Sequence, residues 1–591
     1  MSVLRAARLC TLLVLGSISL ALTGCAFSVG PIAGSGSATT GGVTPGSPTA
    51  KGVLGGRVYG AQSPITGAAV SLWAAGTTGS YGTGQTLIAT TTTVSNGNFS
   101  FNNVSGVSPC TTGQLLYITS TGGNTGSGTN QYAALMAALP SPCSAATGNT
   151  FVVVNEVTTV ASVTALQQFM SITPGGSPAW MIGAPATNAT GLANAFTQVG
   201  NLVNIGTGTS GATTATNTVG SVTYTTTITP DSTKINTMAD VLAACINTTG
   251  SSVCTSLFTN TTPLNSAAPT DTIQVAYYLA TNPGGVNLPN SSGEPAYLAS
   301  NYIVANIPFA PYNASLTDWT IDVNWKATNG TSTVGTANVP SVAIDGSGNI
   351  WTSSLTSTTT GLGVTEFNPA GQVQFTPATT ASVVGGWQFS SCTTCTTPVS
   401  LGGTHTGDGI AIDTGGNAWA TSWNGTTNTI SSQIEAPVVK VTPGTGAVSA
   451  YLVGYSPAGI SIDGNNNLYI GDGASASSNR YYESELVAGP ATGNLTLNAG
   501  TGRTTTGAYY WSSTVDEAGY VWPTTDAGET SIPRITNTGG LSTVGSTTAL
   551  PSAVYWLAAD ASGNAWGSTT TTTAGATGLE YIKMIIKLAQ A

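Results

Sequence analysis

The cysteines are the first residues whose type and spacing could do chemistry. The chain has eight of them in 591 residues. Cys392-Thr-Thr-Cys395 has the Cys-x-x-Cys spacing of redox and zinc sites, and the single histidine of the chain, His405, follows it. No thioredoxin-like βαβ pattern surrounds the pair, and a zinc ion would need two further ligands. We therefore interpret Cys392 and Cys395 as a structural disulfide, and we predict no metal site and no cofactor.

Other residues that could catalyse a reaction occur singly. A serine hydrolase would have to use His405, and the sequence has no Gly-x-Ser-x-Gly motif. Glu156 is a lone acid in the apolar stretch 151–163. It could be a general acid or base, or a glutamate in the first turn of a helix that Asn155 caps, where the helix dipole favours it. We prefer the second interpretation because no partner is visible, and we predict no catalytic residue.

The first 24 residues have the parts of a secretory signal peptide: a basic start, an apolar run and small residues at the cut. The apolar run, 9–22, is too short to span a bilayer as a helix. Its ending, Leu22-Thr23-Gly24-Cys25, resembles the lipobox of bacterial lipoproteins. The resemblance implies that cleavage leaves Cys25 as the new N-terminus and that its thiol carries diacylglycerol. Residue 26 is alanine and not aspartate, which favours the outer membrane by the sorting rule of diderm bacteria.

An exported chain with an even number of cysteines is expected to form disulfides. Cys10 lies in the signal peptide and Cys25 takes lipid, so six cysteines remain. Six cysteines allow many connectivities, but these six fall into local pairs. The pairs that we predict are Cys110–Cys143, Cys245–Cys254 and Cys392–Cys395.

The composition excludes some classes of protein. Only 6% of the residues are charged, far below the usual quarter, while 40% are hydrophobic, which argues against a disordered chain. Removal of residues 1–24 removes two arginines and leaves 10 basic and 22 acidic side chains, a net charge of −12. Nucleic acid is therefore not an expected partner. Residues 25–52, rich in Gly, Ser, Thr and Pro, are predicted to be a flexible tether.

From residue 53 the pattern changes to short strands. Apolar and polar residues alternate in 56–60, 64–73 and 93–101, and Asn96-Gly97 predicts a hairpin turn. The order of these segments resembles the carboxypeptidase regulatory-like domain, a small transthyretin-like β-sandwich, over residues 53–122. The resemblance implies a spacer or a stability module without catalytic residues.

Residues 123–315 change to helical spacing. Asp231 and Ser232 can cap one helix and Thr270 another. Cys245 near a helix end and Cys254 shortly after it would hold a helical turn. Apolar residues fall on one face of each of two helices, the first with Leu192, Phe196, Val199 and Val203, the second with Ile235, Met238, Leu242, Cys245 and Ile246.

The C-terminal part repeats one motif: an apolar strand, an Asp-x-x-Gly-Asn type of turn, and a strand with an aromatic residue. The aspartate can hydrogen-bond the turn backbone, and Gly or Asn accepts a positive φ. Successive aspartates are between 44 and 68 residues apart. The shortest spacing is that from Asp516 to Asp560 and the longest is that from Asp345 to Asp413. Spacings of this size are typical of propeller blades. We predict that the recurring aromatic residues are buried between blades. The five copies are 342–351, 410–419, 460–469, 513–522 and 557–566, ending on Trp351, Trp419, Tyr469, Trp522 and Trp566.

The repeat resembles the NHL-type and virginiamycin B lyase-like β-propellers over about residues 316–591. The resemblance implies a ring of five or six blades, with a sixth blade hidden in 318–325 or in the insert 376–400. We expect the C-terminal strand 582–588 to close the ring by pairing with a strand near 320–325.

The lyase family uses histidines and a glutamate around a metal on one propeller face. This chain offers only His405, in the loop 403–408, and we find no matching acid–histidine group in the next blade. The catalytic residues of the family are therefore not carried over to this sequence.

These features predict a multidomain, mainly β protein with a small β-sandwich, a helical middle region and a C-terminal five- or six-bladed β-propeller. The predicted function is that of a membrane-anchored extracytoplasmic lipoprotein, a binding or scaffold module that acts through its propeller. Its predicted partners are the lipid bilayer, through acylated Cys25, and a cell-wall or extracellular glycan or a protein ligand. The alternative is a propeller lyase or hydrolase acting on a polysaccharide or a cyclic peptide. Convergent His, Asp or Glu side chains on the central face would favour the enzyme.

Overall fold

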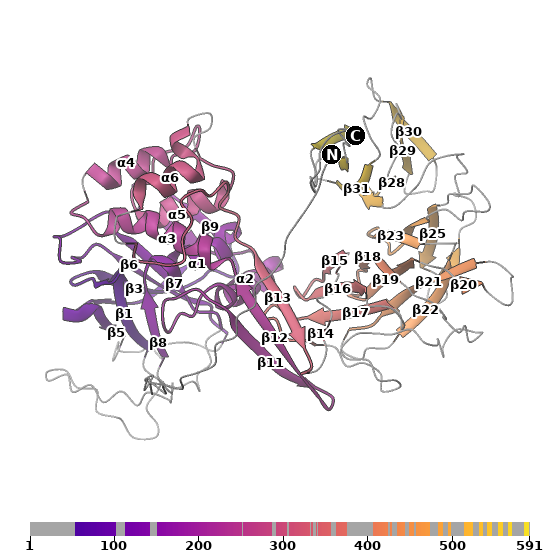
Figure 1. Ribbon diagram of the computed structural model, residues 1–591, viewed down its shortest axis with the longest axis horizontal. Coiled ribbons are helices and arrows are strands. Elements are labelled where there is room, and N and C mark those ends of the chain that lie inside the picture. Colours follow the sequence, from indigo (N-terminus) through magenta and orange to yellow (C-terminus); the bar gives the residue numbers. More distant parts are fainter. Residues whose placement is uncertain are drawn as a thin grey trace, which may run out of the picture. The chain divides into compact units, whose positions relative to one another are not determined.

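The computed structural model shows a mainly β protein with many small sheets (Figure 1). The residues that it describes are 54–101, 113–141, 150–250, 252–286, 291–303, 307–330, 333–334, 339, 341–355, 362–374, 406–423, 426–427, 434–443, 448–453, 457–472, 483–488, 495–497, 513–523, 531–535, 541–545, 554–559, 565–569 and 584–589.

The N-terminal strands form two small sheets. In the first, β1 (Leu54–Gly60) pairs antiparallel with β2 (Ser63–Pro64) and β5 (Asn98–Ser100), and parallel with β8 (Thr150–Val154). The second has the order β4-β3-β6-β7. Apolar residues of both sheets are buried in one core with the helices that follow. The strands of the second sheet are β3 (Ala69–Ala74), β4 (Thr86–Thr92), β6 (Leu116–Thr121) and β7 (Ala134–Ala138).

The structure corrects two predictions about these sheets. β7 and β8 follow residue 122 but pair with β6 and β1, so a domain boundary at 122 would divide paired strands. Asn96 and Gly97 do have positive φ, 71° and 70°, as their turn chemistry predicts. However, β4 before the turn pairs with β3, and β5 after it pairs with β1. The turn therefore links two sheets and does not close a hairpin.

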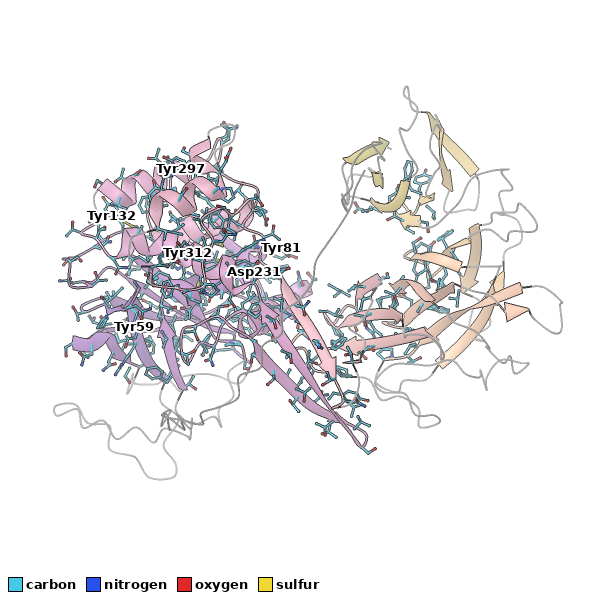
Figure 2. The ribbon with its side chains drawn as sticks, in the orientation of Figure 1. Tyr59, Tyr81, Tyr132, Asp231, Tyr297 and Tyr312 are labelled. Carbon is cyan, nitrogen blue, oxygen red and sulfur yellow. A yellow bond between two sulfur atoms is a disulfide. The ribbon has the colours of Figure 1, made fainter. Side chains whose placement is uncertain are left out.

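Helices follow the first strands. The two apolar faces predicted for α2 and α3 are buried as expected. Asp231 caps α3 through its side chain, which accepts from the backbone N of Lys234, and Asp231 is labelled in Figure 2. The cap of α5 is Asp271 and not Thr270; the carboxylate of Asp271 accepts from the N of Gln274. The helices are α1 (Glu156–Leu166), α2 (Ala189–Leu202), α3 (Ser232–Ile246), α4 (Ser252–Asn260), α5 (Thr272–Thr281) and α6 (Pro295–Tyr302). Short β9 (Met170–Ile172) and β10 (Trp180–Ile182) pair with each other.

A long hairpin follows α2, and the strand that leads from the helices to the C-terminal sheets pairs with it. β11 (Thr213–Val219) and β12 (Val222–Pro230) pair with each other, and β13 (Val323–Thr328) lies between β12 and β14 (Thr333–Val334), as Figure 1 shows. β13 pairs with β12 over its whole length and with β14 only at Ala327 and Thr328, while β33 (Met584–Ala589) pairs with β32 (Ala565–Thr569). Among the described strands, β33 shares a sheet only with β32 and β31 (Val554–Ala559), so the predicted closure of the ring by pairing of the C-terminal strand with residues 320–325 is wrong. Residues 323–328 belong to the sheet of β11, β12 and β14.

Five antiparallel sheets then succeed one another along the chain. The first strands of successive sheets lie beside one another: β15 by β18, β18 by β23, β23 by β27 and β27 by β31. This is the arrangement of propeller blades. The first sheet consists of β15 (Ser341–Ile344), β16 (Ile350–Leu355) and β17 (Leu362–Phe367), and the second of β18 (Thr406–Ile412), β19 (Ala418–Trp423), β20 (Thr426–Thr427), β21 (Ile434–Val441) and β22 (Val448–Val453). The third consists of β23 (Pro457–Ile462), β24 (Leu468–Asp472), β25 (Glu483–Ala488) and β26 (Leu495–Leu497), and the fourth of β27 (Ser513–Val515), β28 (Val521–Pro523), β29 (Ser531–Ile535) and β30 (Leu541–Gly545). The fifth consists of β31 (Val554–Ala559), β32 (Ala565–Thr569) and β33 (Met584–Ala589).

The recurring aromatic residues are buried, as predicted. Trp351, Trp419, Tyr469 and Trp522 expose between 0% and 3% of their surface. Trp419 packs with apolar residues of the following blade, and Tyr469 does the same with Val521. The side chain of the fifth aromatic residue, and the insert 376–400, lie outside the described residues. In the described part of the chain, no helix is long and apolar enough to cross a membrane.

Candidate binding site

Each described blade turn joins its aspartate to the aromatic residue six positions later. Oδ2 of the aspartate accepts from the indole Nε1 of Trp351 at 3.1 Å, of Trp419 at 2.9 Å and of Trp522 at 2.9 Å. In the third blade the hydroxyl of Tyr469 makes the corresponding contact at 3.4 Å. The repeat therefore places a hydrogen-bond acceptor beneath each buried aromatic ring, which a buried indole N–H requires.

The other carboxylate oxygen of these aspartates holds the turn itself. Oδ1 of Asp345 accepts from the backbone N of Ser347 and of Asn349, each at 2.9 Å, while Oδ2 also accepts from the Asn349 side chain at 3.0 Å. Asp345 thus accepts four hydrogen bonds when the indole is included. The carboxylate of Asp345 therefore holds the turn backbone and the indole of the following strand.

A charged residue stands opposite the aromatic residue on the next strand of each blade. Strand pairing places Glu366 opposite Trp351 and Lys440 opposite Trp419. In the second blade Lys440 Nζ lies 3.8 Å from Asp413 Oδ2 and 5.2 Å from the centre of the Trp419 ring, so a positive charge stands beside the aspartate. By backbone register the corresponding positions of the third, fourth and fifth blades are Glu485, Arg534 and Lys587.

In the first blade this position carries a carboxyl group beside a carboxylate. The Asn349 amide donates to Oε1 of Glu366 at 2.8 Å and also to Asp345. Burial, and then the charge of Asp345, raise the pKa of Glu366 from 4.5 to about 7. A carboxyl group in this position avoids like-charge repulsion by holding a proton.

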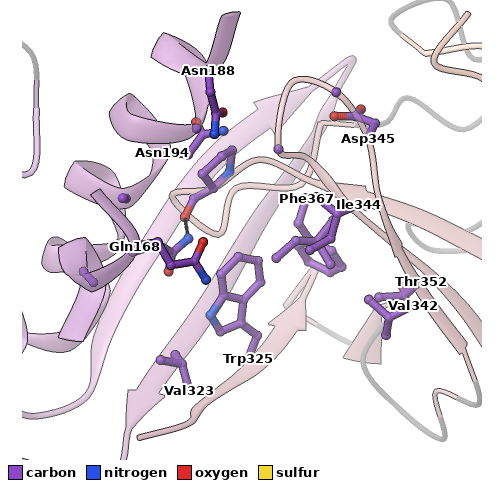
Figure 3. Close-up of a pocket in the computed structure, with 18 of the residues that line it drawn as sticks. Gln168, Asn188, Asn194, Val323, Trp325, Val342, Ile344, Asp345, Thr352 and Phe367 are labelled. Atoms are coloured by element: carbon purple, nitrogen blue, oxygen red, sulfur yellow. Dashed lines mark hydrogen bonds between the residues drawn. The ribbon is translucent and has the colours of Figure 1, made fainter. Parts of the chain in front are cut away.

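The first blade also forms one wall of a cavity of about 830 Å³ (Figure 3). Helix α2 and the end of α1 form the opposite wall, and β13 contributes Val323 and Trp325. The cavity has the size of ordinary small-molecule sites. Its lining combines apolar and aromatic side chains with amides: Ala165, Gln168, Phe169, Asn188, Gly191, Asn194, Ala195, Gln198, Val323, Trp325, Val339, Val342, Ile344, Asp345, Gly346, Gly348, Ile350, Thr352, Phe367 and Pro369.

Amide side chains fasten the two walls of this cavity. Asn194 donates to the carbonyl of Ser347, and Gln198 to that of Pro369, each at 2.8 Å. These bonds join α2 to the two turns of the first blade. Asn188 donates to the hydroxyl of Tyr81, a residue labelled in Figure 2. The bonds of Asn194 and Gln198 therefore hold the two walls together, which favours a preformed site.

A second hollow, of about 490 Å³, lies next to two buried carboxyl groups on α1 and α3. Glu156 Oε1 accepts from the backbone N of Ala61 at 2.8 Å, and Asp240 Oδ1 from the N of Phe309 at 3.1 Å. Ala61 and Phe309 line the hollow, whereas the two acids do not. Burial raises the pKa of Glu156 to about 8, with a smaller contribution from the charge of Asp240, and burial raises the pKa of Asp240 to about 7.

The interpretation of Glu156 as a first-turn residue is confirmed. Asn155 caps α1 and its side chain accepts from Thr158 N at 2.9 Å. Cys245 and Cys254 form the disulfide that their spacing predicts. Within the described ranges, three or more His, Cys, Asp or Glu residues nowhere gather as they would around a metal ion. The remaining predicted positions, Cys25, Cys110, Cys143, Cys392, Cys395 and His405, lie outside the described residues.

Sequence reasoning missed the cavity and its residues. Trp325 and Gln168 lie far apart along the chain and belong to no repeat. The only local signal was an aromatic residue in the strand 323–328, which the sequence assigned to the propeller. Its true neighbours are β12 and β14.

The described chain is thus a mainly β protein whose C-terminal sheets follow one another as propeller blades. No protein-family model and no curated protein matches it. Similar solved structures include a gluconolactonase from Xanthomonas campestris, with 13% identity, 43% of this chain and 73% of that chain covered, and a TM-score of 0.28.

Two further similar structures come from other bacteria. PorZ, a surface component of the type-IX secretion system of Porphyromonas gingivalis, has 16% identity, with 42% of this chain and 35% of that chain covered, and a TM-score of 0.29. The calcium-binding protein regucalcin from Agrobacterium tumefaciens has 11% identity, with 38% and 66% covered, and a TM-score of 0.25. TM-scores of this size define neither a family nor a ligand for this chain.

Proposed function

We propose that this chain is a lipid-anchored, extracytoplasmic binding protein of the bacterial envelope, held to the outer membrane through acylated Cys25. Its ligand-binding site is the cavity between α2 and the first propeller blade. The observation that carries the proposal is the lining of this cavity, which joins aromatic and aliphatic side chains to amides on a preformed frame. Residues 25–52 serve as the tether, and the β-sandwich resembling carboxypeptidase regulatory-like domains serves as a stability module, since its sheets share one core with the helices.

Binding is favoured over catalysis by the state of the acid at the cavity. Asp345 is the one carboxylate among the described lining residues, and its oxygens accept three hydrogen bonds from its own turn and one from the indole of Trp351. The same use of aspartate recurs at Asp413 and Asp516, away from the cavity. A recurring structural role explains these acids without catalysis. A lyase or hydrolase would need a catalytic group from elsewhere, such as His405, the single histidine of the chain.

The test uses the full-length chain with Cys25→Ala, so that it is exported without lipid. The purified protein is immobilised and exposed separately to envelope polysaccharide, to peptidoglycan and to solubilised outer-membrane proteins. We expect one of these to be retained and to remain chemically unchanged. Retention of none of them would contradict a binding function. New reducing ends or unsaturated sugars in the recovered polysaccharide would establish the enzymatic alternative.

A further inference from the structure

The cavity between α2 and the first blade excludes several ligand classes by its chemistry. None of its described lining residues is Lys, Arg or His, so an anionic ligand would find no charge-assisted partner. An acyl chain would cover the amide of Gln168 and the acceptor oxygens of Asn188 and Asn194 without offering them hydrogen bonds, and burying polar atoms without partners is costly. The ligand is therefore neither anionic nor wholly apolar, and it must combine an apolar face with hydrogen-bonding groups such as hydroxyls.

Trp325 provides a surface for the apolar face of such a ligand. Its indole is half-buried and packs edge-on against Phe367, with ring centres 5.7 Å apart and planes at 66°. Figure 3 shows the ring between Gln168 on the α1–α2 side and Phe367 on the blade side. β12 pairs with β13 along its whole length and places Ile228 opposite Trp325, so the backbone that carries this ring is held in the sheet. A rigid aromatic ring that is partly wetted suits a ligand with one apolar face and polar edges.

The amides provide the polar partners. Gln168 is exposed at the cavity, and its amide carries both donors and an acceptor. Asn188 and Asn194 use their NH2 groups to bind Tyr81 and Ser347, and each amide also has an acceptor oxygen. A hydroxyl group can donate to an amide oxygen and accept from an amide N–H.

From these features we propose that the cavity binds a neutral saccharide chain, with one sugar ring stacked on Trp325 and its hydroxyls bonded to Gln168 and Asn194. A sugar ring has an apolar C–H face for the indole and hydroxyls at its edge for the amides. The proposal names the ligand class of the binding function proposed above, and it rests on that function.

The test is calorimetric titration of the full-length Cys25→Ala protein. The neutral probes are cellohexaose, maltohexaose, laminarihexaose and chitohexaose; the comparison probes are polygalacturonate and palmitate. We expect at least one neutral probe to bind and neither comparison probe to bind. Trp325→Ala should weaken the binding about tenfold or more, as for the loss of a central aromatic contact. Gln168→Ala, an exposed position that can be changed without disturbing the core, should weaken it several-fold.

Tyr312→Ala is the matched control. Tyr312 is an exposed aromatic residue that does not line the cavity (Figure 2), so its loss should leave the affinity unchanged. If Trp325→Ala fails to fold, the affinities of Trp325→Phe and Gln168→Ala for the neutral probes are measured in its place. Neutral probes that bind equally to all variants would overturn the placement, and binding of polygalacturonate or palmitate instead would overturn the ligand class. Retention of an envelope protein while every neutral probe fails would overturn the saccharide and leave the binding function intact.

Discussion

Trp419 donates from Nε1 to Oδ2 of Asp413 at 2.9 Å, and this bond fastens a buried ring to the turn that precedes its strand. The same carboxylate accepts from two backbone N–H groups of the turn through Oδ1, at 2.9 and 2.8 Å. One aspartate therefore couples turn geometry to aromatic packing. Lys440 adds a positive charge 3.8 Å from the carboxylate, so the second blade has a closed hydrogen-bonding and charge network.

Trp419→Phe should loosen the second blade. The change removes the N–H donor and leaves a buried carboxylate oxygen short of one hydrogen bond, which costs roughly 1–3 kcal/mol. Hydrogen exchange should accelerate in β18 and β19. Tyr469→Phe is the matched control, because its contact with Asp463 is longer, 3.4 Å. An equal or larger acceleration around Tyr469 would show that the indole bond is not the cause.

Glu366 should make the first blade more stable in acid than at neutral pH. The pKa of Glu366 in the fold, about 7, lies above its ordinary value of 4.5. The stability that protonated Glu366 contributes to the blade is therefore complete below pH 4.5 and is lost as the pH rises through 7. Glu366→Gln should remove this dependence and protect the blade above pH 7. Hydrogen exchange of residues 341–374 at pH 5 and pH 8 measures the stability of the blade in the wild type and in Glu366→Gln. Lys440→Gln should weaken its blade at both pH values, and a pH-independent wild type would contradict the prediction.

Glu156 should make the helical region sensitive to alkali. Its pKa in the fold is about 8, so the stability that the protonated form contributes is present below 4.5 and is lost as the pH rises through 8. Glu156→Gln should flatten the loss of helix signal between pH 7 and 9.5, followed by circular dichroism. Asp322→Asn, at an exposed acid, should leave the wild-type profile in place. A wild type whose signal stays constant to pH 9.5 would be incompatible with this role.

The Cys245–Cys254 disulfide should stabilise the helical region. It joins the end of α3 to α4 over nine residues, and closing a short loop contributes about 2–3 kcal/mol in the chain-entropy model. The double change Cys245→Ala with Cys254→Ala should lower the melting temperature. Reductant should lower that of the wild type similarly. Intact-mass analysis should find six masked thiols in the mature chain; free thiols at Cys392 and Cys395 would reopen the redox and metal interpretations.

Cys25→Ala should release the protein from the membrane. Acyl chains contribute roughly 0.8 kcal/mol per buried CH2, and the substitution removes the site of acylation. Fractionation of cell envelopes with and without detergent measures the change. Ser47→Ala, in the same tether, serves as the control and should stay with the membrane. A Cys25→Ala protein that still sediments with membranes would rule out the lipid anchor.

The sequence predicted those features whose partners lie close together along the chain. Asn155 and Asp231 cap helices whose first turns they precede. The blade turns are also local, since aspartate and aromatic residue are six positions apart. Short contacts of this kind depend on turn chemistry and on the period of apolar residues, which a single sequence contains.

The sequence alone therefore determined the caps, the blade turns, the burial of their aromatic residues and the spacing of Cys245 and Cys254. Only the tertiary structure decided that β13 pairs with β12, that Glu366 faces Asp345, and that Trp325 and Gln168 line one cavity. Strands bring together residues from distant parts of the chain, and the choice of partner depends on packing and available edges. Turn chemistry contains no information about that choice, which is why the predicted closure failed while the predicted turns formed.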